Sequence, residues 1–431
     1  MATICVTGIW HQGAVVSACL ADLANSVRGV CDEKTAAALN SGQPPVYEPE
    51  LSEIIQRNVS AGRLYYTTDF GEGLKDAEFI FICTDTPVHA NDDSDLTPIY
   101  AIAESIGRNL KSNIVLCVTA QVPVGTSEDL AGVIRELAPA YKCQVAYIPE
   151  FLRLGTAVET FRQADRFVIG CNDAVVAERV AVLYRPLGRP IVFTDIRSAE
   201  MAKHASNAYL AASISFINEI ANLCEVVNAN ALEVARIMKL DKRIGQFAFL
   251  SPGLGFAGGT LGREIRALQR LGRQYRCDTP MMDAVMTVNQ ARARLVGQRL
   301  QRIYDSLEGL QVGILGLTYK PGTSTLRRAI ALDIIRDLVS QGASVKAFDP
   351  LARLDEVADL PPFQPCPDPY AAAQGSDALV LVTEWAGIRD LDLPRLRAAM
   401  RRPVFIDTRN LFDPAQMQKV GFIYLGIGRG R

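Results

Sequence analysis

The turn GIWHQG at residues 8–13 has the spacing of a dinucleotide-binding turn, G-x-G-x-x-G, with Trp10 in place of the middle glycine. It follows an apolar, strand-like run and opens a helical pattern. Asp32 ends the next strand-like run, nineteen residues after Gly13. In such a frame the glycines let the backbone approach a pyrophosphate, and the acid binds a ribose hydroxyl. The spacing therefore indicates a dinucleotide site at Gly8, Gly13 and Asp32.

Trp10 leaves two interpretations of this turn open. A side chain at the middle position collides with the pyrophosphate if the turn keeps its usual shape. In that case the domain has lost its dinucleotide. If the turn is reshaped, the indole points away and the cofactor still binds.

The elements that position this turn are short apolar runs that alternate with helical patterns. Because most of the runs are continuously apolar, they predict strands buried on both faces, and the βαβ rhythm predicts parallel, doubly wound sheets. The predicted strands cover residues 3–8, 26–31, 78–84, 113–119, 145–148 and 166–170, and then 312–317, 343–348, 378–383, 404–406 and 422–425.

The middle of the chain has no strand pattern. A long helical pattern at residues 199–227 opens after Ser198, a suitable N-cap, and residues 281–305 are again helical. The predicted fold is therefore α/β, with two Rossmann-like doubly wound parallel-sheet domains joined by a central helical domain. We expect the domains at residues 1–196, 197–295 and 296–431.

Composition excludes several classes of protein. The 431 residues are 49% hydrophobic with a net charge of −2, which suits folded domains and gives no general attraction for nucleic acid. No run of about 18 apolar residues predicts a membrane helix, and the first residues lack a signal-peptide pattern. Ten scattered cysteines without a C-x-x-C pair suit reduced thiols in a cytoplasmic protein. His11, His89 and His204 are too dispersed to predict a metal site.

Several short segments, taken in order, resemble the UDP-glucose/GDP-mannose dehydrogenase family, and most of all its UDP-sugar branch. Each segment alone is weakly specific, but their order and spacing cover nearly the whole chain. They are LNSG at 39–42 with YEPEL at 47–51, CTDTP at 83–87, VPVGT at 122–126, PEFL at 149–152, EMAK at 200–203 with Asn207, DKRIG at 241–245, GFAGG at 255–259, YKPGT at 319–323 with Arg327, and DTRN at 407–410.

The resemblance implies an N-terminal NAD domain, a central helix that forms a homodimer, and a C-terminal domain that binds UDP. It also implies oxidation of a sugar C6 alcohol to an acid, in two hydride transfers with a thiohemiacetal between them, as a step toward polysaccharides. The implied site residues are catalytic Lys203, Asn207, Glu150, Thr260, Glu264 and Gln121, cofactor-binding Gly8, Gly13, Asp32, Thr86 and Arg327, and substrate-binding Phe151, Leu152, Arg243, Phe256, Gly258 and Lys320.

Lys203 and Asn207 lie four residues apart, on one face of the predicted helix. The resemblance places both beside the reacting oxygen, where an alcohol oxidation needs a group that stabilises the oxyanion. It places Glu150 nearby as an acid. The alternative for the pair is a solvated helix face, and for Glu150 an ordinary exposed carboxylate.

The thiol that the family uses as its nucleophile is missing from this sequence. Aligned without gaps, Thr260 occupies the cysteine position, and a hydroxyl is a far poorer nucleophile at neutral pH. Cys277 is the nearest cysteine and is better explained as a core thiol. Gln121 replaces a threonine that helps hold the hydrolytic water, and Leu154 replaces a glutamate.

Three functions fit these residues. The first is an NAD-dependent oxidoreductase on a UDP-sugar that stops at the aldehyde, or oxidises and re-reduces a carbon. The second is an ordinary UDP-glucose 6-dehydrogenase with a replacement nucleophile. The third is a catalytically degenerate protein that binds UDP-sugars. The sequence favours the first, narrowly ahead of the third.

Overall fold

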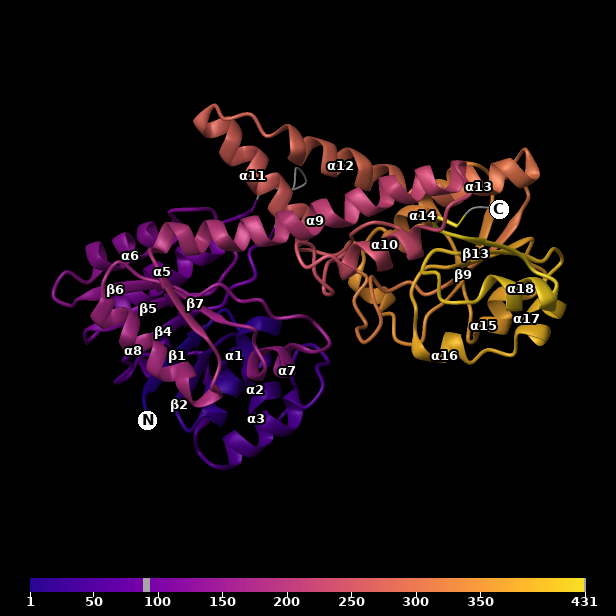
Figure 1. Cartoon of the computed structure of the whole chain (residues 1–431). Helices are drawn as coiled ribbons and strands as arrows, with labels where there is room; N and C mark the ends of the chain where they lie inside the picture. Colours follow the sequence, from indigo (N-terminus) through magenta and orange to yellow (C-terminus); the bar gives the residue numbers. More distant parts are fainter. Residues whose placement is uncertain (88–93, 430–431) are drawn as a thin grey trace. The chain divides into compact units, whose positions relative to one another are not determined.

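The computed structural model describes residues 1–87 and 94–429 (Figure 1). The chain divides into two compact units, Met1–Ala205 and Ser206–Arg431. The division falls inside the long helix α9 (Ile196–Val226).

The first unit is built on an eight-stranded sheet in the order β3-β2-β1-β4-β5-β6-β7-β8. Its paired strands run parallel, except that β7 is antiparallel to β6. The strands are β1 (Thr3–Thr7), β2 (Ser26–Val30), β3 (Leu64–Thr67), β4 (Phe79–Ile82), β5 (Ile114–Val118), β6 (Cys143–Tyr147), β7 (Phe167–Gly170) and β8 (Ile191–Thr194).

Helices cover both faces of this sheet (Figure 1). On one face α5 and α6 pack on the central strands, and on the other face α1, α3, α7 and α8 do so. The helices are α1 (His11–Asp22), α2 (Glu33–Asn40), α3 (Leu51–Ser60), α4 (Phe70–Gly73), α5 (Thr97–Asn109), α6 (Thr126–Leu137), α7 (Ala157–Arg162) and α8 (Ala174–Tyr184), followed by a 3₁₀ turn at Arg185–Leu187.

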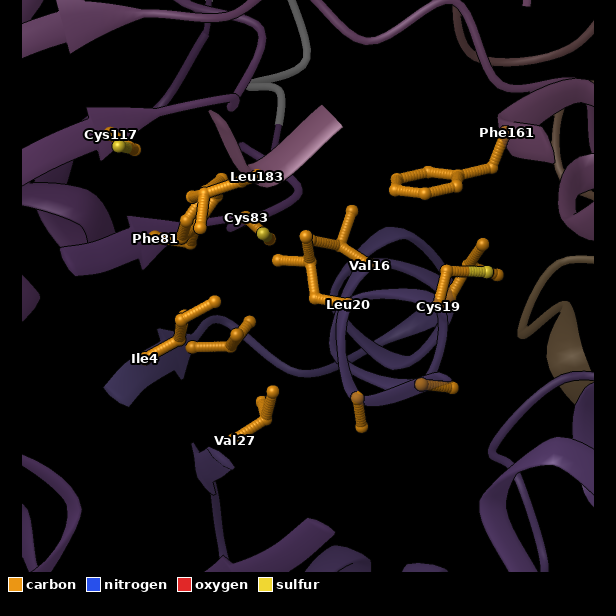
Figure 2. Close-up of a cluster of buried hydrophobic side chains, with 14 of the residues drawn as sticks. Ile4, Val16, Cys19, Leu20, Val27, Phe81, Cys83, Cys117, Phe161 and Leu183 are labelled. Carbon is orange, nitrogen blue, oxygen red and sulfur yellow. The ribbon is translucent and has the colours of Figure 1, made fainter. Parts of the chain in front are cut away.

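Burial on both faces explains why the central strands are continuously apolar. All four residues of β4 and all five of β5 are buried. Figure 2 shows one of the two clusters, where Val16 and Leu20 of α1 lie near Phe81 of β4 and Ile4 of β1. The helix α1 is therefore fixed against the strand that leads into the turn at residues 8–13.

The sequence prediction missed the two edge strands of this sheet, β3 and β8. Tyr65 in β3 and Val192 and Phe193 in β8 are exposed, so neither strand is a continuous apolar run. The β6–β7 pair departs from the predicted parallel arrangement, since these two strands are antiparallel and are joined at Tyr147 and Gly170.

The second unit contains a six-stranded parallel sheet in the order β11-β10-β9-β12-β13-β14. Its strands are β9 (Gln311–Leu315), β10 (Ser344–Phe348), β11 (Gln364–Pro365), β12 (Ala378–Leu381), β13 (Val404–Asp407) and β14 (Ile423–Gly426). The first six positions of the N-terminal sheet and the whole of this one have the same order, 3-2-1-4-5-6, which is typical of dinucleotide-binding folds. The two-residue edge strand β11 was not predicted, since it is exposed and contains a proline.

Helices complete the second unit. They are α10 (Ala231–Leu240), α11 (Leu261–Tyr275), α12 (Pro280–Arg292), α13 (Leu295–Tyr304), α14 (Ile330–Ser340), α15 (Pro369–Ala373), α16 (Ala386–Arg389), α17 (Leu393–Ala399) and α18 (Pro414–Val420), with a 3₁₀ turn at Leu354–Glu356. The predicted helix at residues 281–305 is therefore two helices, α12 and α13, with a break at Ala293 and Arg294.

The long helix α9 begins earlier than the sequence predicted. Asp195, rather than Ser198, is the capping residue, because its carboxylate accepts a hydrogen bond from the backbone N–H of Ser198 at 2.9 Å. Within the described ranges, no helix has the length and apolar character needed to cross a membrane.

Candidate active site

The turn after β1 requires both of the glycines that the sequence singled out. Gly8 has a φ of +74°, and a Cβ there would lie 2.4 Å from Oγ1 of Thr84. A Cβ on Gly13 would lie 2.6 Å from the carbonyl oxygen of Gly8. The start of α1 therefore packs directly on the turn. Because β1 and β4 are neighbours at the point where the strand order reverses, the turn lies where ligands bind in open α/β sheets.

Trp10 has a negative φ at this turn. Because its φ is −130°, the position lies outside the left-handed region that favours glycine, and its side chain is 41% exposed. The indole meets the ring of His11 edge-on, with centroids 6.2 Å apart. No side chain caps the N-terminus of α1, so its first N–H groups stay available to an anion.

Two further groups beside the turn suit a bound dinucleotide. Asp32 is exposed, and hydrogen bonds from the backbone and hydroxyl of Thr35 at 2.9 and 2.6 Å lower the pKa of its carboxyl. The Asp32 carboxylate is therefore an anion that can accept hydrogen bonds from ribose hydroxyls. The buried hydroxyl Oγ1 of Thr84 has no hydrogen-bond partner among residues 1–87 and 94–429. An orphaned buried hydroxyl next to an uncapped helix start fits a site that a polar ligand completes.

The loops after β4 and β5 are tied together beside this turn. Thr86 is buried and donates from Oγ1 to the backbone oxygen of Gln121 at 3.0 Å. Gln12 donates from Nε2 to Thr119, to its carbonyl and hydroxyl oxygens, both at 3.0 Å. The backbone of the predicted catalytic Gln121 is thus held by Thr86, and Gln12 of the dinucleotide turn holds Thr119, two residues earlier.

The segment after β6 carries the predicted acid, Glu150. The residue as a whole is half-buried, but Oε1 of its carboxyl is out of contact with water and has no hydrogen-bond partner in the part of the chain that the structure describes. Burial raises the pKa of Glu150 to about 7, although the positive charge of Lys203 lowers it in part. A pocket runs along this segment, lined among others by Glu150, Phe151, Arg153 and Arg166.

Lys203 is placed on the same segment. Its Nζ donates to the backbone oxygen of Glu150 and lies 4.7 Å from the centre of the Phe151 ring. Arg166 lies at the same distance from that ring. Leu152, also predicted at this site, lines the pocket and packs on the core. Phe151 therefore holds two cations beside a buried acid.

Two residues near the start of α9 tie this helix to residues 122–127, and the sequence analysis did not assign either to the site. The buried carboxylate of Glu200 accepts hydrogen bonds from the N–H groups of Gly125 and Ser127 at 2.6 and 3.1 Å. The buried His204 contacts the carbonyl oxygen of Val122 at 3.0 Å. Glu200 lies inside the EMAK segment, so the motif contained the signal.

The second unit brings Asn207 and Glu264 together. Both are buried, and Nδ2 of Asn207 donates to Oε1 of Glu264 at 3.0 Å. Glu264 belongs to the first turn of α11, whose N-cap residue is Thr260. The Thr260 side chain is exposed and does not cap the helix.

The predicted sugar-nucleotide residues of this unit fall into two sets. Phe256 is fixed through its backbone by Asn289, with hydrogen bonds of 2.8 and 3.0 Å. Gly258 has a φ of +80°, and a Cβ there would lie 3.2 Å from the ring of Tyr319, next to Lys320. The loop at 255–259 and the turn at 319–323 thus lie together.

Of the other two predicted residues of this unit, Arg327 precedes Arg328, whose carbonyl oxygen accepts a hydrogen bond from the N–H of Gly258 at 3.0 Å. Arg243 pairs with Asp241 at 2.6 Å, and its side chain is 89% exposed. Arg327 is exposed, and its backbone N–H is held by Oγ1 of Thr325 at 3.2 Å. His89 lies outside the described residues, and no group of His, Cys, Asp or Glu side chains within residues 1–87 and 94–429 could hold a metal ion.

Three family models match nearly the whole chain. They describe the UDP-glucose/GDP-mannose dehydrogenase family: its NAD binding domain at residues 2–188, its central domain at 197–291 and its UDP binding domain at 313–414. The chain belongs to the UDP-glucose/GDP-mannose dehydrogenase family.

The individual relatives of this chain belong to the same family. A UDP-glucose 6-dehydrogenase of Pseudomonas aeruginosa is 38% identical, with 99% of this chain and 98% of the relative covered. The UDP-glucose 6-dehydrogenase TuaD of Bacillus subtilis is 36% identical, with 100% and 94% covered. The structure of a UDP-glucose dehydrogenase from Pyrobaculum islandicum superposes with a TM-score of 0.92 at 31% identity, covering 100% and 98% of the two chains.

These findings confirm the predicted family and the α/β fold class of two sheet domains with a helical centre. They also confirm the prediction of an NAD-dependent oxidoreductase that acts on a CH–OH group. The turn at residues 8–13, Asp32 and the orphaned Thr84 hydroxyl fit NAD, so they are the residues that would hold it.

We expect NADH to bind at the turn and to accept excitation energy from Trp10. The chain has only one other tryptophan, Trp385, in the second unit. A fluorescence titration should show quenching that Trp10→Phe largely removes. Because the indole is exposed and the backbone needs no glycine, Trp10→Gly should change NADH affinity by no more than about 3-fold, under 0.7 kcal/mol. A tenfold or greater gain in Trp10→Gly would mean that the indole blocks the site.

Several cysteines are poorly suited to replace the thiol that the resemblance expects at residue 260. Cys277 is exposed, so its interpretation as a core thiol was wrong. It follows the far end of α11 and is separated from Thr260 by a 15-residue helix, roughly 22 Å at 1.5 Å per residue. Burial raises the pKa of Cys5, Cys19, Cys83 and Cys143 to about 12. Thiols in such surroundings are poor nucleophiles.

Proposed function

We propose that this chain oxidises a UDP-sugar at an alcohol carbon by a single hydride transfer and does not carry the product on to the acid. The observation that carries the proposal is Thr260 at the start of α11, with Cys277 a helix-length away. Without a thiol the aldehyde cannot be held as a thiohemiacetal, which the second oxidation needs. The aldehyde is then released. Where the oxidised alcohol is instead a secondary one on the sugar ring, the product is a ketone, which the NADH just formed can re-reduce to a different stereoisomer.

Three side chains are proposed to perform the first oxidation. NAD, when bound, supplies the acceptor for the hydride. The ammonium of Lys203 and the amide of Asn207, one turn apart on α9, stabilise the alcohol oxygen as it becomes negative. The carboxylate of Glu150 takes the hydroxyl proton, so that an aldehyde and a protonated Glu150 remain. Glu264 orients the Asn207 amide through the 3.0 Å hydrogen bond.

The substrate is proposed to be a UDP-sugar, and UDP-glucose is the first to test. The match to a UDP binding domain and the names of the relatives support this choice. Gly258, Phe256 and Lys320 are proposed to contact the sugar nucleotide, since their loops are fixed beside each other.

The amount of NADH formed per sugar tests the proposal. Wild-type protein with UDP-glucose and NAD should form at most one NADH per sugar consumed, together with an aldehyde, or a stereoisomer with no net NADH. Two NADH per sugar and a uronate would overturn it. That outcome would favour an ordinary UDP-glucose 6-dehydrogenase, as the relatives are named. Binding of UDP-glucose without any turnover would favour a degenerate binding protein.

The pH dependence of the oxidation should report Glu150. Only the ionised carboxyl can accept the proton, and burial raises its pKa to about 7. With that pKa, kcat/KM should rise with pH and level off above about 8, and at pH 6 it should be about tenfold below the plateau. Glu150→Gln should lose the inflection together with most of the activity. An unchanged pH profile in Glu150→Gln would contradict this role.

The same carboxyl makes folding stability depend on pH. Its pKa is higher in the folded chain, so the folded state binds the proton more tightly and stability falls as pH rises from 4.5 to about 7. Glu150→Gln lacks this loss. Its Tm should therefore exceed that of the wild type at pH 8 by more than it does at pH 5.

The segment 197–295 is proposed to serve as the dimerisation domain, through α9. Tyr209, Phe216 and Leu223 are exposed large apolar residues spaced seven apart along this helix. Such a stripe is typical of a helix face that packs on a partner. Phe216→Glu should turn a dimer into a monomer in sedimentation velocity, whereas a charge at the exposed Tyr275 of α11 should not.

A further inference from the structure

A fully buried carboxylate in the first unit takes no part in the chemistry proposed above. Glu48 is 3% exposed, and Oε2 lies 2.8 Å from Nε2 of His11. The same carboxylate accepts hydrogen bonds from the backbone N–H groups of Gly155 and Ala157, at 2.8 and 2.6 Å. Burial alone would raise the pKa of Glu48, but these hydrogen bonds outweigh it and bring the pKa below its usual value.

The partners of Glu48 belong to two different parts of the site. His11 is inside the dinucleotide turn at residues 8–13 and touches Trp10 ring to ring. Gly155 and Ala157 close the segment 149–157, which carries Glu150 and Phe151. One buried carboxylate therefore joins the cofactor turn to the segment that bears the proposed acid, over sequence separations of 37, 107 and 109 residues.

We infer that Glu48 and His11 are positioning residues that couple dinucleotide binding at the turn to the placement of the segment 149–157. The inference rests on the function proposed above. A pyrophosphate on the turn restrains His11, His11 restrains Glu48, and Glu48 holds the segment through two amide N–H groups. A sugar nucleotide then binds a segment that is already ordered. The two ligands should therefore bind with positive coupling, and the coupling should be reciprocal.

The hydrogen bonds of Glu48 are not the only contacts that hold α7 in place. Arg162, at the end of α7, pairs with Glu50 at 2.8 Å and with Asp22 at 3.1 Å near the surface. These ion pairs hold α7 without Glu48, so variants of the buried link should still fold. Glu50 also supplies a matched control, because it is a carboxylate two residues from Glu48 that touches α7 but not the cofactor turn.

The experiment measures binding of UDP-glucose by calorimetry, with and without saturating NADH, which cannot accept hydride from the sugar. In the wild type, NADH should tighten UDP-glucose binding at least about 5-fold. Glu48→Gln and His11→Phe should each bring that ratio close to 1. In Glu48→Gln, which lies outside the cofactor turn, NADH alone should bind within about 3-fold of wild type. Glu50→Gln should keep the wild-type ratio. His11→Gln should also keep it, since its amide can donate from nearly the same place as Nε2.

Two results would overturn the inference while leaving the proposed function intact. One is a wild type that binds both ligands without coupling, and the other is full coupling in both Glu48→Gln and His11→Phe. A wild type that binds neither ligand would instead overturn the proposed function, and the inference with it. Thermal melts show whether each variant is folded. If Glu48→Gln fails to fold, His11→Phe decides, because it leaves Glu48 with both amide donors.

Discussion

Replacing Thr260 by cysteine is expected to convert an oxidation that yields one NADH per sugar into one that yields two and ends in a uronate. The new thiolate adds to the aldehyde carbon and forms a thiohemiacetal. Hydride then leaves that carbon for a second NAD, which gives a thioester, and water cleaves the thioester to the acid and the free thiol. The second oxidation should be faster by about 10³-fold or more, the scale on which nucleophiles matter to turnover.

The position of residue 260 suits a thiolate. It is the N-cap of the 15-residue helix α11, and the present side chain does not bond to the helix. The partial positive charge of a helix N-terminus stabilises an anion and lowers the pKa of a thiol. A threonine hydroxyl in the same place remains protonated, because its pKa is far above that of a thiol.

Mass spectrometry and NADH counting measure this outcome. If Gln121 occupies the position of the water-holding threonine, as the sequence resemblance implies, Thr260→Cys alone should accumulate the thioester as a covalent adduct. Adding Gln121→Thr should speed its release. Thr260→Ser and Cys277→Ser are the controls, and neither should raise the yield above one NADH. One NADH and no adduct in Thr260→Cys, or two NADH in the wild type, would contradict the prediction.

Much of the fold could be predicted because the central strands obey a simple rule. A strand covered on both faces must be apolar throughout, as β4 and β5 are. The edge strands β3 and β8 escape that rule, since exposed Tyr65 and Phe193 interrupt the apolar run. The antiparallel pairing of β6 and β7 consists of a single bridge between Tyr147 and Gly170, and no local sequence pattern predicts it.

A site residue could be predicted from the sequence where one short motif contained both the residue and the structural constraint that requires it. Gly8 and Gly13 are examples, because the spacing of the turn demands small residues and the backbone leaves no room for a Cβ. The backbone conformation of Trp10 could not be predicted, because the sequence does not specify its φ of −130°. The ordinary collision argument assumes the usual turn geometry.

Contacts between distant segments were beyond sequence reasoning. Asn207 meets Glu264 across 57 residues, and Glu48 meets Ala157 across 109. Each pair is a buried polar group that requires a partner, but its type alone does not say which. The raised pKa of Glu150 likewise follows from burial that only the three-dimensional packing creates.

Lys203→Met is expected to abolish most of the first oxidation. The interaction between the Lys203 ammonium and the alcohol oxygen is stronger in the transition state, when that oxygen is negative, than in the ground state. Its loss should therefore lower kcat by about 10²–10³-fold, roughly 3–4 kcal/mol, with little change in KM. Methionine keeps the unbranched chain and its contact with Phe151. Stopped-flow measurement of NADH formation separates kcat from KM.

Arg166→Met provides the matched control for that loss. Lys203 and Arg166 both lie 4.7 Å from the centre of the Phe151 ring, so each variant removes one cation from the same aromatic side chain. If Lys203 acted only by holding Phe151 in place, the two variants should lose activity alike and mainly through KM. If Lys203 stabilises the oxyanion, Lys203→Met should fall far below Arg166→Met in kcat. Equal losses would remove Lys203 from the reaction and leave it a packing role, because both substitutions disturb the position of Phe151.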